Sequence, residues 1–213
     1  MSAPPYAPDR DCPLCPRLAQ FREANRAGYP GFFNAPVPSF GSRDARLLVL
    51  GLAPGLKGAN RTGRPFTGDY AGDLLYSTLL AFGLARGRFE ARPDDGLELL
   101  DCRIANAVRC VPPENKPVGA EISACRRFLV AELAAMPRLA AIVALGSIAH
   151  QSAVAAFGAR KALTKFGHGS RHVLPNGLLL FGSYHCSRYN TNTGRLTETM
   201  FHDVFRAACA ALA

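Results

Sequence analysis

Four short segments made almost entirely of apolar residues recur along the chain and constrain its fold most strongly. They predict strands over residues 46–51, 103–108, 139–145 and 178–183. Continuous apolar runs of this length are typical of strands buried on both faces in a parallel sheet. The helical spacing of apolar residues predicts helices over 12–26, 71–84, 119–136, 146–157 and 196–212. This alternation predicts an α/β sandwich with a mostly parallel sheet.

Three loops follow predicted strands, at residues 51–68, 108–117 and 184–194. In parallel sheets, ligands bind in the crevice outside the carboxyl ends of the strands. We therefore expect these loops to converge on one site. Residues 28–43, rich in Gly, Pro and Phe, are predicted to be irregular. No repeat or long linker divides the sequence, so we expect one domain over residues 1–213.

The composition excludes a disordered chain and a membrane-spanning one. Hydrophobic residues make up 48% of the 213 residues and charged residues 19%, which is enough to bury a core. The longest uncharged apolar run covers residues 139–149, and a membrane-spanning helix needs roughly 20 residues. The first residues resemble no secretory signal. We expect a soluble, cytoplasmic monomer.

The positive charge points toward nucleic acid. The net charge is +9, and Arg supplies most of the basic residues. The Arg side chain offers a planar set of donors that suits phosphate oxygens, although a GC-rich genome would also raise the Arg content. Residues 133–197 contain no Asp or Glu but seven Arg or Lys. Such a stretch would form a positive face for DNA, and in a prokaryote we expect association with the nucleoid.

Seven cysteines in a cytoplasmic chain favour metal or redox chemistry over disulfides. Cys12 and Cys15 form a CxxC pair, and Cys110 and Cys125 flank the Pro-rich part of the second loop and the start of a predicted helix. Four thiolates from two distant segments could hold a tetrahedral zinc ion or a [4Fe–4S] cluster. Unrelated buried cysteines are the alternative. The other cysteines have no pairing logic, and Cys102 and Cys209 are assigned to the core.

The Gly-rich loop after the first predicted strand excludes two common nucleotide sites. Lys57 is wrongly spaced for a Walker A loop, and the GxGxxG pattern of dinucleotide sites is absent. Read in order, five segments resemble the iron–sulfur uracil-DNA glycosylases of family 5, the B-type branch. They are Cys12-Pro-Leu-Cys15, Gly51-Leu-Ala-Pro-Gly55, the segment 58–69, the segment 107–117 and Ser183-Tyr-His-Cys-Ser-Arg-Tyr-Asn190.

This resemblance implies a three-layer α/β/α sandwich around a four-stranded, mostly parallel sheet. It implies a DNA-repair enzyme that removes uracil, and hypoxanthine among other deaminated bases, from DNA. It also implies that Cys12, Cys15, Cys110 and Cys125 hold a structural [4Fe–4S] cluster that ties the N-terminal segment to the core. Other branches carry a polar residue where this chain has Ala53.

The resemblance assigns catalysis to Asp69, Asn115 and His185. Hydrolysis of an N-glycosidic bond requires a positioned water, stabilisation of a cationic sugar and donation toward the departing base. Asp69 would orient the water and offset the charge on the sugar, and Asn115 would position the water or contact the base. His185 would donate an N–H to the base. The alternatives are a helix N-cap for Asp69, a structural histidine for His185 and a turn residue for Asn115.

Base recognition requires the nucleotide to flip from the duplex into a pocket. The resemblance makes Phe66 the platform on which the base stacks, with Asn106 and Asn190 as base-binding residues. Arg188, Tyr189 and Arg195 would contact the DNA. No Lys lies at a position suited to a Schiff base, so a monofunctional glycosylase is expected. The rival hypotheses are a zinc-bound nucleic-acid-binding protein without catalysis and an N-glycosyl hydrolase of small molecules.

Overall fold

Four parallel strands at the centre of the sheet confirm the strands predicted from the apolar segments. The computed structural model describes residues 5–213. These strands are β2 (Leu47–Gly51), β5 (Cys102–Asn106), β6 (Ala141–Leu145) and β8 (Leu179–Ser183). They pair in parallel in the order β5-β2-β6-β8, and nearly all of their residues are buried. Both faces are therefore covered, as their continuous apolar composition predicts.

Two short antiparallel strands extend this sheet at its edges and are absent from the sequence prediction. Strand β1 (Phe40–Gly41) pairs with β5, and β7 (Arg171–Val173) pairs with β8. The prediction that residues 28–43 are irregular is thus wrong at β1. A separate two-stranded sheet joins β3 (Ala85–Arg86) to β4 (Glu98–Leu99). Strands of two or three residues are too short to show an alternating pattern, which explains their omission.

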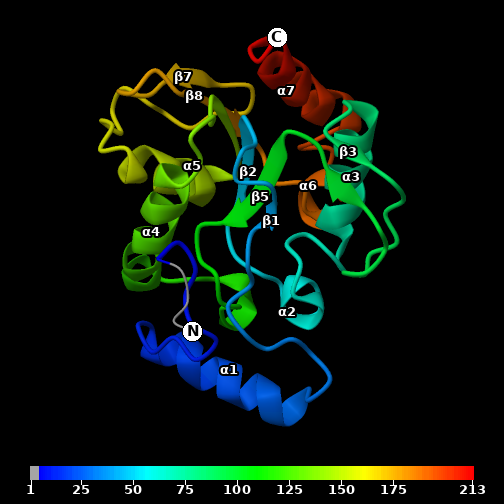
Figure 1. Cartoon of the computed structure of the whole chain (residues 1–213), viewed down its shortest axis with the longest axis vertical. Coiled ribbons are helices and arrows are strands. Elements are labelled where there is room, and N and C mark those ends of the chain that lie inside the picture. The colour runs from blue at the N-terminus through cyan, green and yellow to red at the C-terminus, as the bar shows by residue number, and fades with distance from the viewer. Residues whose placement is uncertain (1–4) are drawn as a thin grey trace.

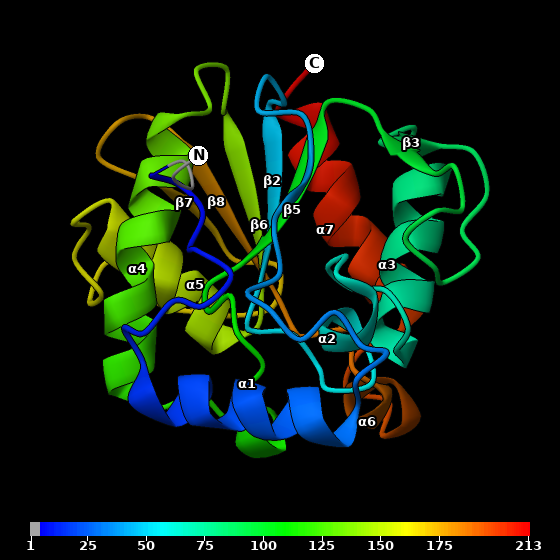
Figure 2. The ribbon, with the colours of Figure 1, turned by 60° about the horizontal axis from the view of Figure 1, so that its bottom comes forward.

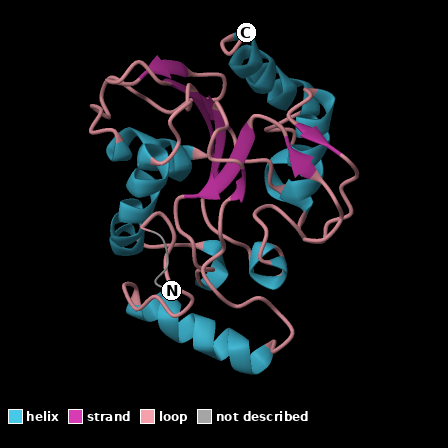
Figure 3. Ribbon diagram, in the orientation of Figure 1, coloured by secondary structure: helices cyan, strands magenta, loops and turns pink. Residues whose placement is uncertain are grey.

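Helices cover both faces of the central sheet and give the expected three layers. Helices α4 (Gly119–Ala134) and α5 (Ser147–Ala156) lie on one face, and α3 (Tyr70–Ala81) and α7 (Glu198–Ala210) lie on the other (Figures 1 and 2). Figure 3 shows the strands between these two groups of helices. A separate apolar cluster fills each interface, and the sheet separates the two clusters.

The predicted helices are confirmed with most boundaries within two residues, and the two larger differences have local reasons. Helix α1 (Pro16–Gly28) begins at Pro16 rather than at residue 12. Proline has no backbone N–H and fits the first turn of a helix, where that group has no partner. Helix α3 ends at Ala81 rather than at residue 84, because Gly83 adopts a positive φ of 68° just beyond it.

The loops at the carboxyl ends of the parallel strands contain three short helical segments. They are α2 (Ala59–Thr62), the 3-10 turn η1 (Pro113–Asn115) and α6 (Arg188–Asn192). Figure 2 shows α1, α2 and α6 at the same end of the sheet. Within residues 5–213, no helix combines the length and the apolar composition needed to cross a bilayer.

A buried group of charged side chains fastens α4 to the edge of the sheet. Arg103 Nε donates to Glu132 Oε1 at 2.8 Å, and Arg109 donates to the other carboxylate oxygen. Arg109 also donates to Ser39, and Arg103 donates to the carbonyl of Gly41. Burial alone would raise the pKa of Glu132, but the two arginines outweigh it and hold that pKa below its ordinary value.

We expect Glu132→Gln to lower the free energy of unfolding by about 3–5 kcal/mol, because two buried guanidinium groups lose their counter-charge. Urea denaturation measures the change. The matched control is Glu98→Gln, whose carboxylate pairs with Arg86 in an exposed ion pair and should cost at most about 1 kcal/mol. Equal losses in the two variants would contradict the structural role of the buried group.

Candidate active site

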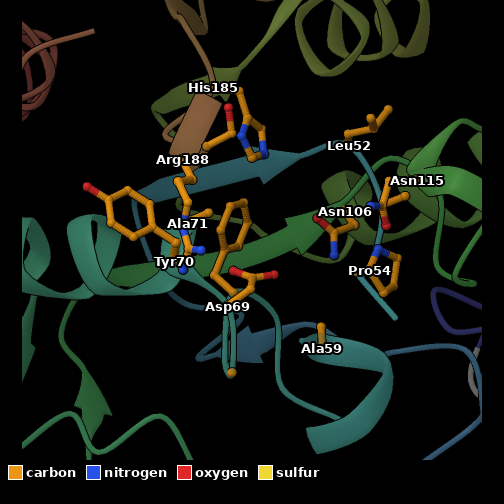
Figure 4. Close-up of a pocket in the computed structure, with 15 residues that line it drawn as sticks. Leu52, Pro54, Ala59, Asp69, Tyr70, Ala71, Asn106, Asn115, His185 and Arg188 are labelled. Carbon is orange, nitrogen blue, oxygen red and sulfur yellow. The ribbon is translucent and has the colours of Figure 1, made fainter. Parts of the chain in front are cut away.

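A cavity of about 540 Å³ opens at the carboxyl ends of β2 and β5. Its walls come from the loop after β2, the start of α3, the end of β5, η1 and the loop after β8, so the three loops converge as expected. Six of the predicted site residues line it, namely Phe66, Asp69, Asn106, Asn115, His185 and Arg188. Figure 4 shows His185 and Asp69 on opposite sides of the cavity, with Asn106 and Asn115 between them on a third side.

Phe66 forms one wall from a tightly fixed turn. Its φ is +54°, a value that non-glycine residues rarely adopt, so the surroundings must hold the turn in place. A Cβ at Gly72 would lie 1.9 Å from the Phe66 carbonyl oxygen, and this close approach requires glycine. The hydroxyl of Tyr76 donates to the Pro65 carbonyl at 2.8 Å. The centroids of the Phe66 and His185 rings are 5.9 Å apart, and the ring planes are inclined by 26°.

A buried ion pair supports the same turn from behind. Arg64 makes two hydrogen bonds to Asp95, at 2.8 and 2.7 Å, and its Nε donates to the Thr67 hydroxyl at 2.9 Å. The Arg64 guanidinium holds the pKa of Asp95 well below its ordinary value. The loop between β3 and β4 thereby fixes the turn that carries Phe66.

His185 faces the cavity from the turn after β8. Burial lowers its pKa to about 4, so the imidazole is neutral at physiological pH and one ring nitrogen carries a proton. Asn190 Nδ2 donates to the His185 carbonyl at 2.8 Å, which fixes the turn. Asn190 is not among the residues that line the cavity, so the structure gives it a supporting position rather than the expected contact with a base.

Asp69 precedes α3 at the N-cap position, but its side chain makes no capping hydrogen bond. The carboxylate instead faces the cavity (Figure 4). A Cβ at Gly58 would lie 2.4 Å from Asp69 Oδ2, so this glycine leaves room for the carboxylate. Solvent reaches Asp69 through the cavity mouth, yet the surrounding walls desolvate the carboxylate and raise its pKa, and the nearby amides of Gly72 and Ala71 offset part of that increase.

The two asparagines occupy different environments. Asn106 is buried at the end of β5, and its Oδ1 has no hydrogen-bond partner among the described residues. An unpaired buried polar atom is costly, so a ligand that supplies a donor would be favoured here. Asn115 is exposed on η1 with a φ of +57°, a conformation that asparagine tolerates better than most residues. Ala53, at the place of a polar residue in other branches, also lines the cavity.

The residues expected to contact DNA are exposed on the segment that follows β8. Of the three, Arg188 lines the cavity and Arg195 does not. The Arg188 guanidinium lies over the Tyr70 ring at 5.4 Å from its centroid, and Arg195 lies over Tyr184 at 4.6 Å. Tyr189 is 71% exposed on α6, although it does not line the cavity. These cations and aromatic faces form a surface suited to phosphates and unstacked bases. Tyr70 was not predicted as a site residue, because its place at the cavity depends on where α3 begins.

The four predicted ligand cysteines lie together beneath α1. Cys12, Cys15, Cys110 and Cys125 line one small hollow, together with the apolar side chains of residues such as Leu18, Val108 and Phe128. Burial raises the pKa of Cys15 to about 11 and that of Cys110 to about 12, and the neighbouring thiols add to the increase. By contrast, Cys102 is fully buried in the core and Cys209 packs against it, as expected.

Four thiols around one hollow are the number of thiolates that a [4Fe–4S] cluster takes. Within residues 5–213, no three His, Cys, Asp or Glu side chains are already arranged as a metal site. Four thiols spread around an apolar hollow suit a cluster whose several irons each take one thiolate. Arg22 approaches Cys110 Sγ at 4.0 Å and donates to the Cys12 carbonyl, which supplies positive charge beside the thiolates.

Comparison with known proteins supports the resemblance. The family model described as the uracil DNA glycosylase superfamily matches residues 38–209. A Type-5 uracil-DNA glycosylase of Thermus thermophilus is 46% identical over 202 residues, covering 92% of each chain. One of Mycobacterium tuberculosis is 44% identical, covering 92% of this chain and 76% of the relative. A Type-4 uracil-DNA glycosylase of Pyrobaculum aerophilum is 32% identical, covering 71% of this chain and 63% of the relative.

We expect the His185 imidazole to titrate with a midpoint near 4 in an NMR experiment on the folded protein, well below the ordinary value of about 6.5. Because the fold favours the neutral ring, this group should make the protein less stable as pH falls from about 6.5 toward 4, with no effect above 6.5. A His185→Gln variant assigns the resonance. A midpoint near 6.5 would show that the imidazole is not desolvated.

Proposed function

Since the chain belongs to the uracil-DNA glycosylase superfamily, we propose that it excises uracil from DNA by hydrolysing the N-glycosidic bond. The observation that carries this proposal is the cavity, in which Asp69 and His185 lie on opposite sides and Phe66 forms one wall. The Asp69 side can hold a water, and the His185 side can stabilise the negative charge that develops on a departing base. An enzyme of this class needs both at once.

Asp69 would act on the sugar side. As a carboxylate it accepts a hydrogen bond from the attacking water and offsets the positive charge that builds on the sugar. Within residues 5–213, no Lys or Arg forms a salt bridge with Asp69, so no cation competes with water and substrate for the carboxylate. Asn115, which lines the cavity from η1, would help to position the same water.

His185 would act on the base side. A neutral imidazole has one N–H, which can donate to the oxygen of the uracil as negative charge develops there. Stabilisation by one well-placed donor is typically worth about 3–4 kcal/mol in the transition state. The hydrogen bond from Asn190 to the His185 carbonyl keeps the ring in place, so Asn190 would be a positioning residue.

The proposed base site lies between Phe66 and Asn106. The uracil would flip out of the duplex, stack on Phe66 and satisfy the unpaired oxygen of Asn106 with its own N–H. Ala53 adds no polar group that would select one base edge, so the cavity would also admit hypoxanthine. Arg188, Tyr189 and Arg195 would contact the DNA around the flipped nucleotide.

No lysine lines the cavity among the described residues, and a Schiff base with the abasic sugar would require an amine. The proposed enzyme therefore leaves the DNA strand intact and is monofunctional. Its monomeric state and its association with the nucleoid stay predictions.

We further propose that Cys12, Cys15, Cys110 and Cys125 hold a [4Fe–4S] cluster. When bound, the cluster would serve as a structural cross-link of metal–thiolate bonds rather than as a reactant. Its place supports this role, because it would tie the segment before α1 to β5 and α4. An ion pair also joins α1 to α4, since Arg17 Nε lies 2.7 Å from Glu121 Oε1.

The proposed activity predicts that duplex DNA with one uracil acquires an alkali-labile abasic site on incubation with the protein. We expect Asp69→Asn, which keeps the shape of the side chain but removes its charge, to slow excision in single-turnover kinetics by at least about 100-fold. Asp73→Asn is the matched control, because Asp73 is an exposed carboxylate on the first turn of the same helix. No cleavage by the wild-type protein would refute the function, and full activity of Asp69→Asn would refute the role of Asp69.

The proposed cluster predicts a brown protein that contains iron and acid-labile sulfide in equal amounts. We expect Cys110→Ala to lose both and to unfold at a lower temperature, because the N-terminal segment loses its cross-link. Cys209→Ala should keep both, since Cys209 lies on α7 and packs against a different apolar cluster from Cys15, Cys110 and Cys125. One equivalent of zinc in place of iron would favour the rival hypothesis of a zinc-bound protein.

A further inference from the structure

Gly55 lies in the loop after β2 and lines the cavity at a place where a side chain would touch two functional oxygens. A Cβ built on this residue would lie 3.2 Å from Asp69 Oδ2 and 3.9 Å from Asn115 Oδ1. No other atom outside the neighbouring residues lies within 4 Å of that position. The absent side chain therefore leaves a gap bounded by a carboxylate and an amide oxygen.

The chemistry of this gap suits one water molecule. A water has two O–H donors, and both bounding atoms are acceptors. A water in the cavity would lie beyond the place of the absent Cβ, in van der Waals contact with the bare Cα of Gly55, where it faces both oxygens. With its two protons engaged in this way, its lone pairs point away from the oxygens and into the cavity, where a sugar carbon would be attacked.

The local backbone does not explain why residue 55 is glycine. Its φ is outside the left-handed region, unlike that of Gly63 at +78° or Gly68 at +90°. The contact with Asp69 Oδ2 involves the end of a side chain, which can shift by a few tenths of an ångström. Alanine would therefore be tolerated by the fold. Gly58 differs, because a Cβ there would lie 2.4 Å from the same oxygen and would displace the carboxylate itself.

We propose that Gly55 is a positioning residue, whose missing side chain forms the seat of the attacking water between Asp69 and Asn115. This inference rests on the proposed function, since a seat for water matters only if the cavity performs hydrolysis. It adds that the size of residue 55, and not only the presence of the two polar side chains, determines the rate.

The test is Gly55→Ala, whose methyl group would project from the Cα toward the water and push it away from the two oxygens. We expect kcat for excision of uracil from a duplex to fall by about 100-fold or more, in line with the loss of a positioned general-base interaction. KM and the affinity for the uracil-containing duplex should change by less than about threefold, because the methyl group lies away from Phe66 and Asn106. The melting temperature should match that of the wild type.

The matched control is Gly28→Ala at the end of α1, where an added Cβ meets nothing within 4 Å. It should leave kcat unchanged. A Gly55→Ala variant with wild-type kcat, or one that loses affinity as much as kcat, would overturn the inference. If the wild type itself excises no uracil, the proposed function fails instead, and the two failures are thus distinct.

A crystal structure of the wild-type protein provides a test that does not depend on how the variant folds. We expect an ordered water within hydrogen-bond distance of Asp69 Oδ2 and of the Asn115 side chain, next to Gly55. In Gly55→Ala that water should be absent. Density for the wild type that shows the gap without this water would overturn the inference.

Discussion

The parallel register of β2 with its neighbours is the constraint on which the site depends. Gly51 at the end of β2 pairs with Asn106 at the end of β5, and Leu145 of β6 pairs with Ser183 of β8. Because parallel strands end at the same edge, the chain leaves all four strands at one place. The loop with Gly55, the turn with His185 and the segment leading to Asn115 meet there, although Gly55 and His185 are 130 positions apart in the sequence.

The positive charge has two separate uses that the composition alone could not distinguish. Arg22, Arg64, Arg103 and Arg109 are all buried, and the last three form hydrogen-bonded ion pairs with acidic partners. These residues fasten the segment before α1 to Cys110, the Phe66 turn to the loop between β3 and β4, and α4 to β5. Arg188 and Arg195, from the stretch without acidic residues, are instead exposed on the surface, and Arg188 lines the cavity. Only such exposed arginines can supply the salt-dependent attraction to DNA phosphates.

The sequence predicted what depends on local pattern and missed what depends on distant contacts. Apolar runs located the four parallel strands, because burial on both faces leaves a continuous signature. The edge strands β1 and β7 have no such signature, since their pairing is imposed by β5 and β8. The position of Asp69 before a helix was equally compatible with a plain N-cap. The orientation of the Asp69 carboxylate depends on the space that Gly58 leaves, which no local pattern predicts. The hydrogen bond from Asn190 to the His185 carbonyl likewise has no signature in the sequence.

The cavity combines a charged rim with an interior that holds one carboxylate and several neutral polar groups. An arginine inside the cavity would pair with Asp69 and lower the pKa of that carboxyl group. Arg64 has this effect on the pKa of Asp95 behind the Phe66 turn. Paired in that way, the carboxylate would direct its lone pairs to a guanidinium rather than to a water. Desolvation by neutral walls has the opposite effect, because it raises the pKa of Asp69 and makes it a better acceptor for a proton of water. With cations at the rim and neutral donors inside, the protein can attract DNA without a cation pairing with the Asp69 carboxylate that would act on the DNA.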